Sequence, residues 1–556
     1  MTLTRREFVA ATAASGFLIA DWASSAQQNG RYASAFLRID AMVERYLRDM
    51  NAPGLTLAIA DRNGVVRVAT YGLSDLDRKE PVRADHLFHI GSITKSFVAI
   101  AMLQLRDEGK IDLHAPVTRY LPWLRIEPRD GITTHHLLSH SSGLPSWVPV
   151  FPSDPSLRMT AGFPPGAHFH YCNVGYAILG HLIETLDGRP FHDVIRARIF
   201  KPLGMNASEA VIGPDLRDRT ANSYVNYRDD RPYRRTGRLA NAPQIVLDNA
   251  AGCIASTPGD MALYLRMLAN RGKPLLTDAA FRDMSTRHVP LEDGGEPGYG
   301  YGLFTETLDD HEIVRHTGGM VSFMSAMHVD PVDGLAAFAS VNAQQGYRPN
   351  PVTIFALRAI RAVNAGKPLP ELPPPSSPTT IKDAKDLAGV YTSAGGEKIE
   401  FVADGEGLFL LYGGKRLAVE AATGEPYVAH PDFELFPFFF EREKGAGPAI
   451  SVGHGGRWWA SERYTGARTF EYPDEWHAYA GHYRNEDPWV GSMRVVARQG
   501  KLWVNGGALL REAGPARFRV AEPDHNPEWI EFREVVNGKA QHVRLSGYDL
   551  WRVLAR

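Results

Sequence analysis

Cysteine is nearly absent from this chain: only Cys172 and Cys253 occur among 556 residues. A disulfide framework needs more cysteines than this, so we read both thiols as small core residues with apolar neighbours. The chain also lacks an excess of charge of one sign, because 61 lysine and arginine residues stand against 63 acidic ones. This balance gives no electrostatic reason to expect nucleic acid or an anionic membrane surface as a partner.

Long hydrophobic runs are missing too, and no stretch is apolar enough for a transmembrane helix. The short apolar stretch Ala10–Ala20 follows the pair Arg5-Arg6 and precedes the small residues Ser24-Ser25-Ala26. That order is typical of a twin-arginine export signal, with an amphipathic leader or an uncleaved anchor as the alternatives. We therefore expect residues 1–26 to direct export to the periplasm or the extracellular space, and the mature protein to have no integral membrane segment.

The chain is 44% hydrophobic and long enough for two to four globular domains. The pattern predicts an amphipathic helix over Tyr32–Leu47, followed by two strands, Gly54–Ala60 and Gly64–Ala69. Helices and loops dominate from there to about Ala365, and strand patterns return near the end of that stretch, at His311–Arg315, Ser325–Val329 and Leu335–Val341. Strands at both ends with helices between them predict an α+β domain over residues 32–365, its sheet closed by its two ends.

A proline-rich segment, Lys367–Pro378, marks a boundary. Beyond it the sequence changes to short alternating strands with glycine-rich turns and many aromatic residues. The segment Leu387–Tyr391 recurs as Tyr479–Tyr483, which indicates two related units. The sequence therefore predicts a linker and two small antiparallel β-barrel units, at residues 366–380, 381–470 and 471–556.

Ser92 and Lys95 lie three residues apart at the start of a predicted helix whose next residues, Phe97–Leu103, are apolar on every side. The spacing places both side chains on one face, one turn apart. Burial lowers the pKa of a lysine, and a neutral amine can take the proton of a neighbouring hydroxyl. Ser92 is therefore a candidate nucleophile with Lys95 as its partner. A snorkelling lysine beside a helix-capping serine is the alternative.

The triplet Tyr171-Cys172-Asn173 lies in a predicted loop before a helix that begins near Gly175. Such a loop can place a phenol beside the serine and an amide where it holds a substrate carbonyl. The phenol can relay protons with Lys95, and which of the two groups is the general base stays open. An aromatic core residue followed by a turn asparagine is the alternative.

A third motif, His316-Thr317-Gly318-Gly319, ends the predicted strand Glu312–Arg315. An edge strand with a cationic or hydrogen-bonding side chain, followed by glycines, can lay a substrate peptide alongside itself. We expect His316, Thr317 and Gly318 to contact the substrate, and the backbone N–H groups of Ser92 and Gly319 to form an oxyanion hole. A strand that simply ends in a glycine turn is the alternative.

Together these motifs resemble the serine β-lactamase and penicillin-binding-protein superfamily, in the branch that holds class C β-lactamases, DD-carboxypeptidases, D-aminopeptidases and related esterases. The similarity runs from about Tyr32 to Ala362. It includes four longer segments, Phe88–Phe97, Leu105–Leu113, Ile132–Pro145 and Phe200–Met205.

The resemblance implies a β-lactamase/transpeptidase-like fold, an antiparallel sheet flanked by helices. In that fold Ser92 is the acylated nucleophile, Lys95 its partner, Tyr171 the proton shuttle and Asn173 a substrate contact. His316 stands where class C β-lactamases have lysine, and His-Thr-Gly is instead similar to some DD-peptidases and D-aminopeptidases, which disfavours efficient β-lactam hydrolysis. Relatives with β-barrel tails use a tail loop to narrow the cleft, and whether one does so here is left open.

Two histidines, His136 and His140, are four residues apart on a probable helix, a spacing that lets a pair share a metal ion. No third ligand is evident nearby, so we expect no metal site, and no cofactor.

The sequence thus predicts an exported serine hydrolase that acts through an acyl-enzyme on a small amide or ester. D-aminopeptidase or DD-peptidase-like activity leads, followed by esterase and then β-lactamase. The expected partner is a small-molecule or peptide substrate, and the oligomeric state is undetermined. The alternative of another class is a non-catalytic or slowly acylated penicillin-recognising protein that binds cell-wall fragments.

Overall fold

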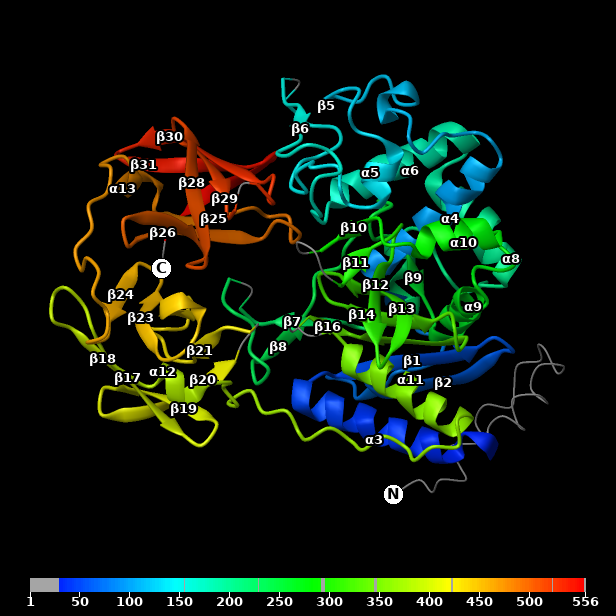
Figure 1. The fold of residues 1–556 in the computed structure, drawn as a ribbon, viewed down its shortest axis with the longest axis horizontal. Coiled ribbons are helices and arrows are strands. Elements are labelled where there is room, and N and C mark those ends of the chain that lie inside the picture. The colour runs from blue at the N-terminus through cyan, green and yellow to red at the C-terminus, as the bar shows by residue number, and fades with distance from the viewer. Residues whose placement is uncertain are drawn as a thin grey trace.

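A nine-stranded antiparallel sheet organises the first two thirds of the chain (Figure 1). The computed structural model describes residues 30–554 apart from 155, 229, 292–295, 345–347, 422–423 and 523, so the expected export signal at 1–26 lies outside the described residues. The strand order is β10-β11-β12-β13-β14-β15-β1-β2-β3. Their bounds are β1 (Gly54–Asp61), β2 (Val65–Asp75), β3 (Glu80–Pro81), β10 (Val289–Pro290), β11 (Gly298–Tyr299), β12 (Phe304–Leu308), β13 (His311–Gly319), β14 (Met324–Asp330) and β15 (Leu335–Val341).

Helices cover both faces of this sheet, and successive side chains of β1 point alternately into the cores on the two faces. Leu55, Leu57 and Ile59 face α3 (Ala33–Met50) and α11 (Asn350–Asn364), which lie side by side over one face. The alternate residues Ala58 and Ala60 belong to the core on the other face. Their small side chains let helices pack closely there. That core is built with α4 (Thr94–Asp107), α6 (Asn173–Asp187) and α9 (Pro258–Ala269).

The two ends of this domain meet in the middle of the sheet. β1 pairs with β15 in antiparallel register, with Leu57 opposite Ala339. The predicted amphipathic helix and the predicted strands at both ends are confirmed as α3, β1, β2, β13, β14 and β15. The predicted α+β domain with an antiparallel sheet flanked by helices is therefore confirmed. No helix in the described part of the chain is both long and apolar enough to cross a membrane.

The remaining third of the chain forms the two predicted antiparallel β units, and each has eight strands. The first is nearly closed, and the second closes fully into a barrel. The first unit contains β17 (Gly389–Thr392), β18 (Lys398–Asp404), β19 (Gly407–Tyr412), β20 (Lys415–Ala421), β21 (Pro426–Val428), β22 (Phe438–Arg442), β23 (Ala449–His454) and β24 (Arg457–Ala460). The second contains β25 (Gly481–Arg484), β26 (Ser492–Arg498), β27 (Lys501–Val504), β28 (Ala508–Gly514), β29 (Arg517–Val520), β30 (Trp529–Val536), β31 (Lys539–Leu545) and β32 (Tyr548–Val553).

The sequence repeat has a structural counterpart in a buried tyrosine. Tyr391 begins the first unit and donates from its hydroxyl to Leu387 O at 2.9 Å. Tyr483 does the same in the second unit, to Tyr479 O at 2.7 Å. Both side chains are buried. The two segments therefore repeat because each fixes the first strand of its unit to the short helix before it.

Both units contact the sheet domain, for example through Arg234–Glu420 and Ser146–Glu528, and so does the proline-rich segment that joins the sheet domain to the first unit. Ser376 donates its backbone N–H to Asp49 on α3 at 2.8 Å. Leu369 and Leu372 pack against the core beneath the same helix. In Figure 1 this segment runs along α3 before it enters the first unit.

Candidate active site

The first motif lies where the end of β13 meets the start of α4. Ser92 is in a 3-10 turn, Gly91–Ile93, and α4 begins at Thr94, so the serine precedes the α-helix rather than starting it. The end of β13 can approach the turn that holds Ser92 this closely only because both segments contain glycine. A Cβ on Gly318 would lie 1.9 Å from Ile90 O. Gly91 has φ of +55° and packs against the backbone of Gly319.

Lys95 is completely buried and makes three polar contacts. Its Nζ lies 3.1 Å from Ser92 Oγ, 2.9 Å from Asn173 Oδ1 and 2.7 Å from Ala251 O. Burial lowers the pKa of Lys95 to about 7, against a lesser opposing effect of the Cys172 thiol. A fraction of the lysine is therefore neutral at neutral pH, as proton transfer from Ser92 requires.

Tyr171 and Asn173 reach the serine from the loop before α6, which begins at Asn173 itself. Burial raises the pKa of the Tyr171 hydroxyl well above its usual value, and the neighbouring Ser92 hydroxyl and Arg348 guanidinium lower it by less. The phenol therefore stays protonated. The Tyr171 hydroxyl has no hydrogen-bond partner among the described residues, so it is available to a substrate atom. Lys95 Nζ lies 4.9 Å from the centre of its ring.

The β13 motif is divided between two faces. The His316 ring is buried, with Nε2 3.1 Å from the Tyr299 hydroxyl and Nδ1 2.7 Å from Thr317 O. Burial, then the charge of Lys95, lowers the pKa of His316 to about 3, so this ring is neutral. Thr317 and Gly319 lie on the opposite, less buried face of the strand. Among these residues, only Gly319 lines the cleft that contains Ser92.

That cleft has a volume of about 500 Å³, and the second barrel forms part of its wall. The loop between β25 and β26 contributes four consecutive residues, Asp487–Val490, and β32 contributes Tyr548. In Figure 1 this loop extends from the barrel toward the sheet domain. The structure thus answers the question that the sequence left open, because a loop of the second barrel narrows the cleft. The other lining residues are Ser92, Ser146, Trp147, Asn173, Gln244, Ile245, Val246, Leu247, Asn249, Ala251, Gly252, Gly319 and Met320.

Three residues of the site were missed from the sequence because no local pattern marks them. Asp487 is the only charged residue among the described residues that line the cleft. Arg348 lies beside Gly319, where a Cβ would be 3.0 Å from Arg348 Nη2, and it pairs with no described carboxylate. Glu528 of the second barrel reaches the loop at Ser146. The only feature of the sequence that pointed to Arg348 was its position shortly after the last predicted strand of the domain.

The two histidines weighed as a metal pair are not on one helix. α5 (Thr134–Leu138) is only five residues long, and His140 follows it with a left-handed backbone, φ 57°. His136 caps the start of α5 through Thr133, and His140 Nδ1 accepts from the Cys172 N–H at 3.0 Å.

Within the described residues, one other group brings potential metal ligands together: His311, Asp330 and Asp333. The Arg361 guanidinium already lies 2.7 Å from Asp330 and 3.1 Å from Asp333. This group is therefore an ion-pair network in which the arginine supplies the positive charge.

The Beta-lactamase family model matches residues 39–362 of the chain. Esterase EstB of Burkholderia gladioli is 29% identical over 384 residues, which cover 59% of this chain and 96% of the esterase. Penicillin-binding protein 4* of Bacillus subtilis (strain 168) is 24% identical over 389 residues, 65% of this chain and 84% of that protein. The octameric penicillin-binding protein homologue from Pyrococcus abyssi has a similar fold, with a TM-score of 0.54, 23% identity and coverage of 85% of this chain and 98% of that one.

The family model spans more than half of the chain and includes all the motif residues around Ser92. The chain therefore belongs to the β-lactamase family and is a serine hydrolase of the β-lactamase and penicillin-binding-protein fold.

Proposed function

We propose that this protein is an aminopeptidase for short peptides or amides of D-amino acids, acting through an acyl-enzyme on Ser92. Lys95 in its neutral form takes the proton from Ser92 Oγ as that oxygen attacks the substrate carbonyl. The N–H groups of Ser92 and Gly319 stabilise the oxyanion. Because the Tyr171 phenol stays protonated, it donates to the leaving amine and receives in exchange the proton that Lys95 took from Ser92, so Lys95 is the base and becomes neutral again. Water then hydrolyses the ester on Ser92.

The observation that carries the choice of substrate is Asp487. It is the only charged residue among the described residues that line the cleft, and the wall combines polar side chains with apolar ones such as Trp147, Met320 and Trp489. One carboxylate oxygen, Oδ1, accepts from the Trp489 N–H at 2.9 Å, which leaves Oδ2 available. A carboxylate with a free oxygen, next to apolar wall residues, favours a substrate with a free ammonium group and an apolar side chain.

Arg348 supports a short substrate. Its guanidinium is beside Gly319, at the end of the strand along which a peptide would lie. A free carboxylate there would give the arginine the anionic partner that the described residues do not provide. Together with Asp487 in the cleft wall, Arg348 favours a short substrate that carries both a free ammonium and a free carboxylate.

Esterase activity is the second candidate. Esterase EstB of Burkholderia gladioli is similar over 96% of its length. The apolar wall of the cleft fits short acyl esters, and an ester needs no ammonium contact.

The test compares kcat/KM for D-phenylalanine p-nitroanilide, its L isomer, its N-acetylated form and p-nitrophenyl butyrate. We expect the free D-aminoacyl anilide to be preferred. Asp487→Asn should remove that preference by about 10-fold or more, since a charge-assisted contact contributes about 1.5–3 kcal/mol. Asp474→Asn, at an exposed aspartate near α13 (Trp476–Tyr479) that does not line the cleft, is the matched control. A preference for the ester or the N-acetylated anilide in the native enzyme contradicts the aminopeptidase proposal.

Export is also proposed, from Arg5-Arg6 and the apolar segment that follows. Cell fractionation of the full chain and of an Arg5→Lys, Arg6→Lys variant tests it. Retention of only the variant in the cytoplasm is the expected result, and equal distribution of both contradicts it.

A further inference from the structure

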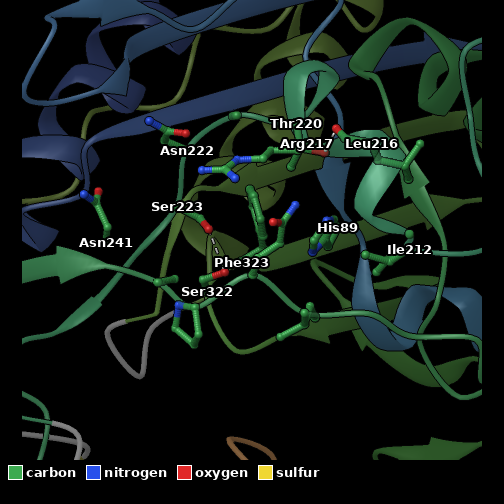
Figure 2. A pocket seen from close by; sticks show the side chains of 16 residues that line it. His89, Ile212, Leu216, Arg217, Thr220, Asn222, Ser223, Asn241, Ser322 and Phe323 are labelled. Atoms are coloured by element: carbon green, nitrogen blue, oxygen red, sulfur yellow. Dashed lines mark hydrogen bonds between the residues drawn. The ribbon is translucent and has the colours of Figure 1, made fainter.

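A second cavity, of about 280 Å³, lies next to the active-site cleft (Figure 2). Its wall combines His89 on β4 (Phe88–His89), the region around the 3-10 helix η4 (Pro214–Arg219), residues 241–245 and the pair Ser322-Phe323. Gln244 and Ile245 line both this cavity and the cleft that contains Ser92, so the two are neighbours.

The charge of the cavity comes from a single arginine. Arg217 lines it, and the lining includes no aspartate or glutamate. The Arg217 side chain is exposed and has no ion pair or hydrogen bond with any described residue. Arg219, two residues along, instead pairs with Glu209 at 2.7 Å. The cavity therefore carries an unneutralised positive charge, which favours an anionic ligand.

His89 gives a second and independent indication of a ligand. The side chain is 7% exposed, and its buried Nδ1 has no hydrogen-bond partner among the described residues. Burial lowers the pKa of His89 to about 4, so the ring is neutral and offers one donor and one acceptor. The His89 ring lies against the Phe323 ring, at 4.7 Å between centres. A buried polar group without a partner costs about 1–3 kcal/mol, and a ligand in the cavity removes that cost.

The remaining polar groups suit the same kind of ligand. The side chains of Asn241 and Gln244 are exposed, and no described residue bonds to them. Ser223 donates to Ser322 at 2.8 Å, which leaves the Ser322 proton free to donate. In Figure 2 the Arg217 guanidinium points toward Asn222, above Ser223. Amide and hydroxyl donors around a guanidinium match a carboxylate that also carries a second polar group.

We propose that this cavity binds a small carboxylate of the size of one amino acid, held by Arg217 and hydrogen-bonded to His89. The carboxylate has two possible sources. It belongs either to a free small molecule or to an acidic residue of a peptide substrate whose scissile bond lies at Ser92. Only the second source rests on the proposed peptidase function.

Binding is measured by calorimetry on the full chain carrying Ser92→Ala, so that it needs no hydrolysis. The probes are D-glutamate, glutarate and the uncharged glutaramide. We expect the two carboxylates to bind and glutaramide not to. Adding Arg217→Gln should weaken binding by about 10-fold or more, as loss of a charge-assisted contact does. His89→Phe, which keeps the ring against Phe323, should weaken it also. Arg282→Gln, at an exposed arginine of α10 (Asp278–Ser285) that lines neither cavity, is the matched control.

The source is decided with the active enzyme. Rates are compared for D-alanyl-D-glutamate and D-alanyl-D-glutamine. A loss in Arg217→Gln confined to the glutamate peptide assigns the carboxylate to the substrate. An unchanged ratio, with free D-glutamate still bound by the native cavity, assigns it to a separate ligand. Absence of saturable carboxylate binding, or binding equal in the presence and absence of Arg217, overturns the proposal. Because that measurement uses Ser92→Ala, failure of the proposed peptidase activity would leave it unaffected.

Discussion

The carboxylate of Glu528, on the second barrel, accepts a hydrogen bond from the backbone N–H of Ser146 at 2.5 Å, across 382 residues of sequence. Ser146 Oγ in turn accepts from the Asn173 N–H at 3.0 Å, and Asn173 Oδ1 accepts from Lys95 at 2.9 Å. Glu528 is 5% exposed, and its second oxygen accepts from Ser546. The barrel is thereby joined to Lys95, the proposed base, through Ser146 and Asn173.

Glu528→Ala should therefore reduce activity, although the Glu528 side chain acts only through Ser146 and Asn173 and does not line the cleft. Loss of the acceptor leaves the Ser146 N–H unpaired, at a cost of about 1–3 kcal/mol, and releases the loop that orients Asn173. We expect kcat to fall about 10-fold with little change in KM, and the pH profile to shift because Lys95 loses a fixed partner. Glu531→Ala, on β30, which begins directly after Glu528, is the control, because Glu531 pairs with Arg533 instead. Equal kinetics of the Glu528 and Glu531 variants contradict the positioning role.

The pH dependence of catalysis should follow Lys95. Its pKa of about 7 means that the neutral base is lost as the pH falls through 7, and kcat/KM should fall with it. The measurement uses a neutral ester, so that no substrate amine titrates. Tyr171→Phe should lower the plateau by about 10²–10⁴-fold and leave the midpoint near 7. If the Tyr171 variant abolishes the acidic limb instead, tyrosine and not lysine is the base.

Much of the site follows from local sequence. Ser92 and Lys95 meet because three residues of helix bring side chains onto one face, and the apolar residues around α4 explain the depressed lysine pKa. The repeated tyrosines, Tyr391 and Tyr483, mark the starts of the two β units because each makes the same local bond. Such features depend on contacts within a few residues, which a sequence pattern records.

The site residues that the second barrel contributes could not be predicted from a local sequence pattern. Asp487 and Glu528 are ordinary polar residues of a β unit, and only the placement of that unit brings them to the cleft. The prediction that His136 and His140 share one helix was wrong for a different reason. His136 caps the helix, and His140 takes a left-handed backbone after it, so tertiary packing ended the helix before the second histidine.

Gly318→Ala should disable the enzyme through the backbone. A Cβ at this position lies 1.9 Å from Ile90 O, so β13 must move away from the turn that holds Ser92. Overpacking of this kind costs about 1–3 kcal/mol of stability, and here it also displaces the Gly319 N–H from the oxyanion site. We expect a lower melting temperature and a large fall in kcat. Gly64→Ala, where a Cβ meets nothing within 4 Å, should leave both unchanged. Native-like activity of the Gly318 variant would show that the oxyanion donor lies elsewhere.

Trp489 should limit the size of substrate that the cleft admits. It stands at the tip of the barrel loop, 37% exposed, and forms part of the cleft wall with Trp147 and Tyr548. Trp489→Ala removes an indole from that wall and opens space for longer peptides, while small substrates lose apolar contact. We expect the ratio of kcat/KM for a tetrapeptide to that for an aminoacyl amide to rise about 10-fold. Trp551→Ala, at an exposed tryptophan of the same barrel that stacks on His542, controls for effects on the barrel itself. If the two variants change the ratio equally, the loop does not act as the size filter, and the barrel supports the site only through Glu528.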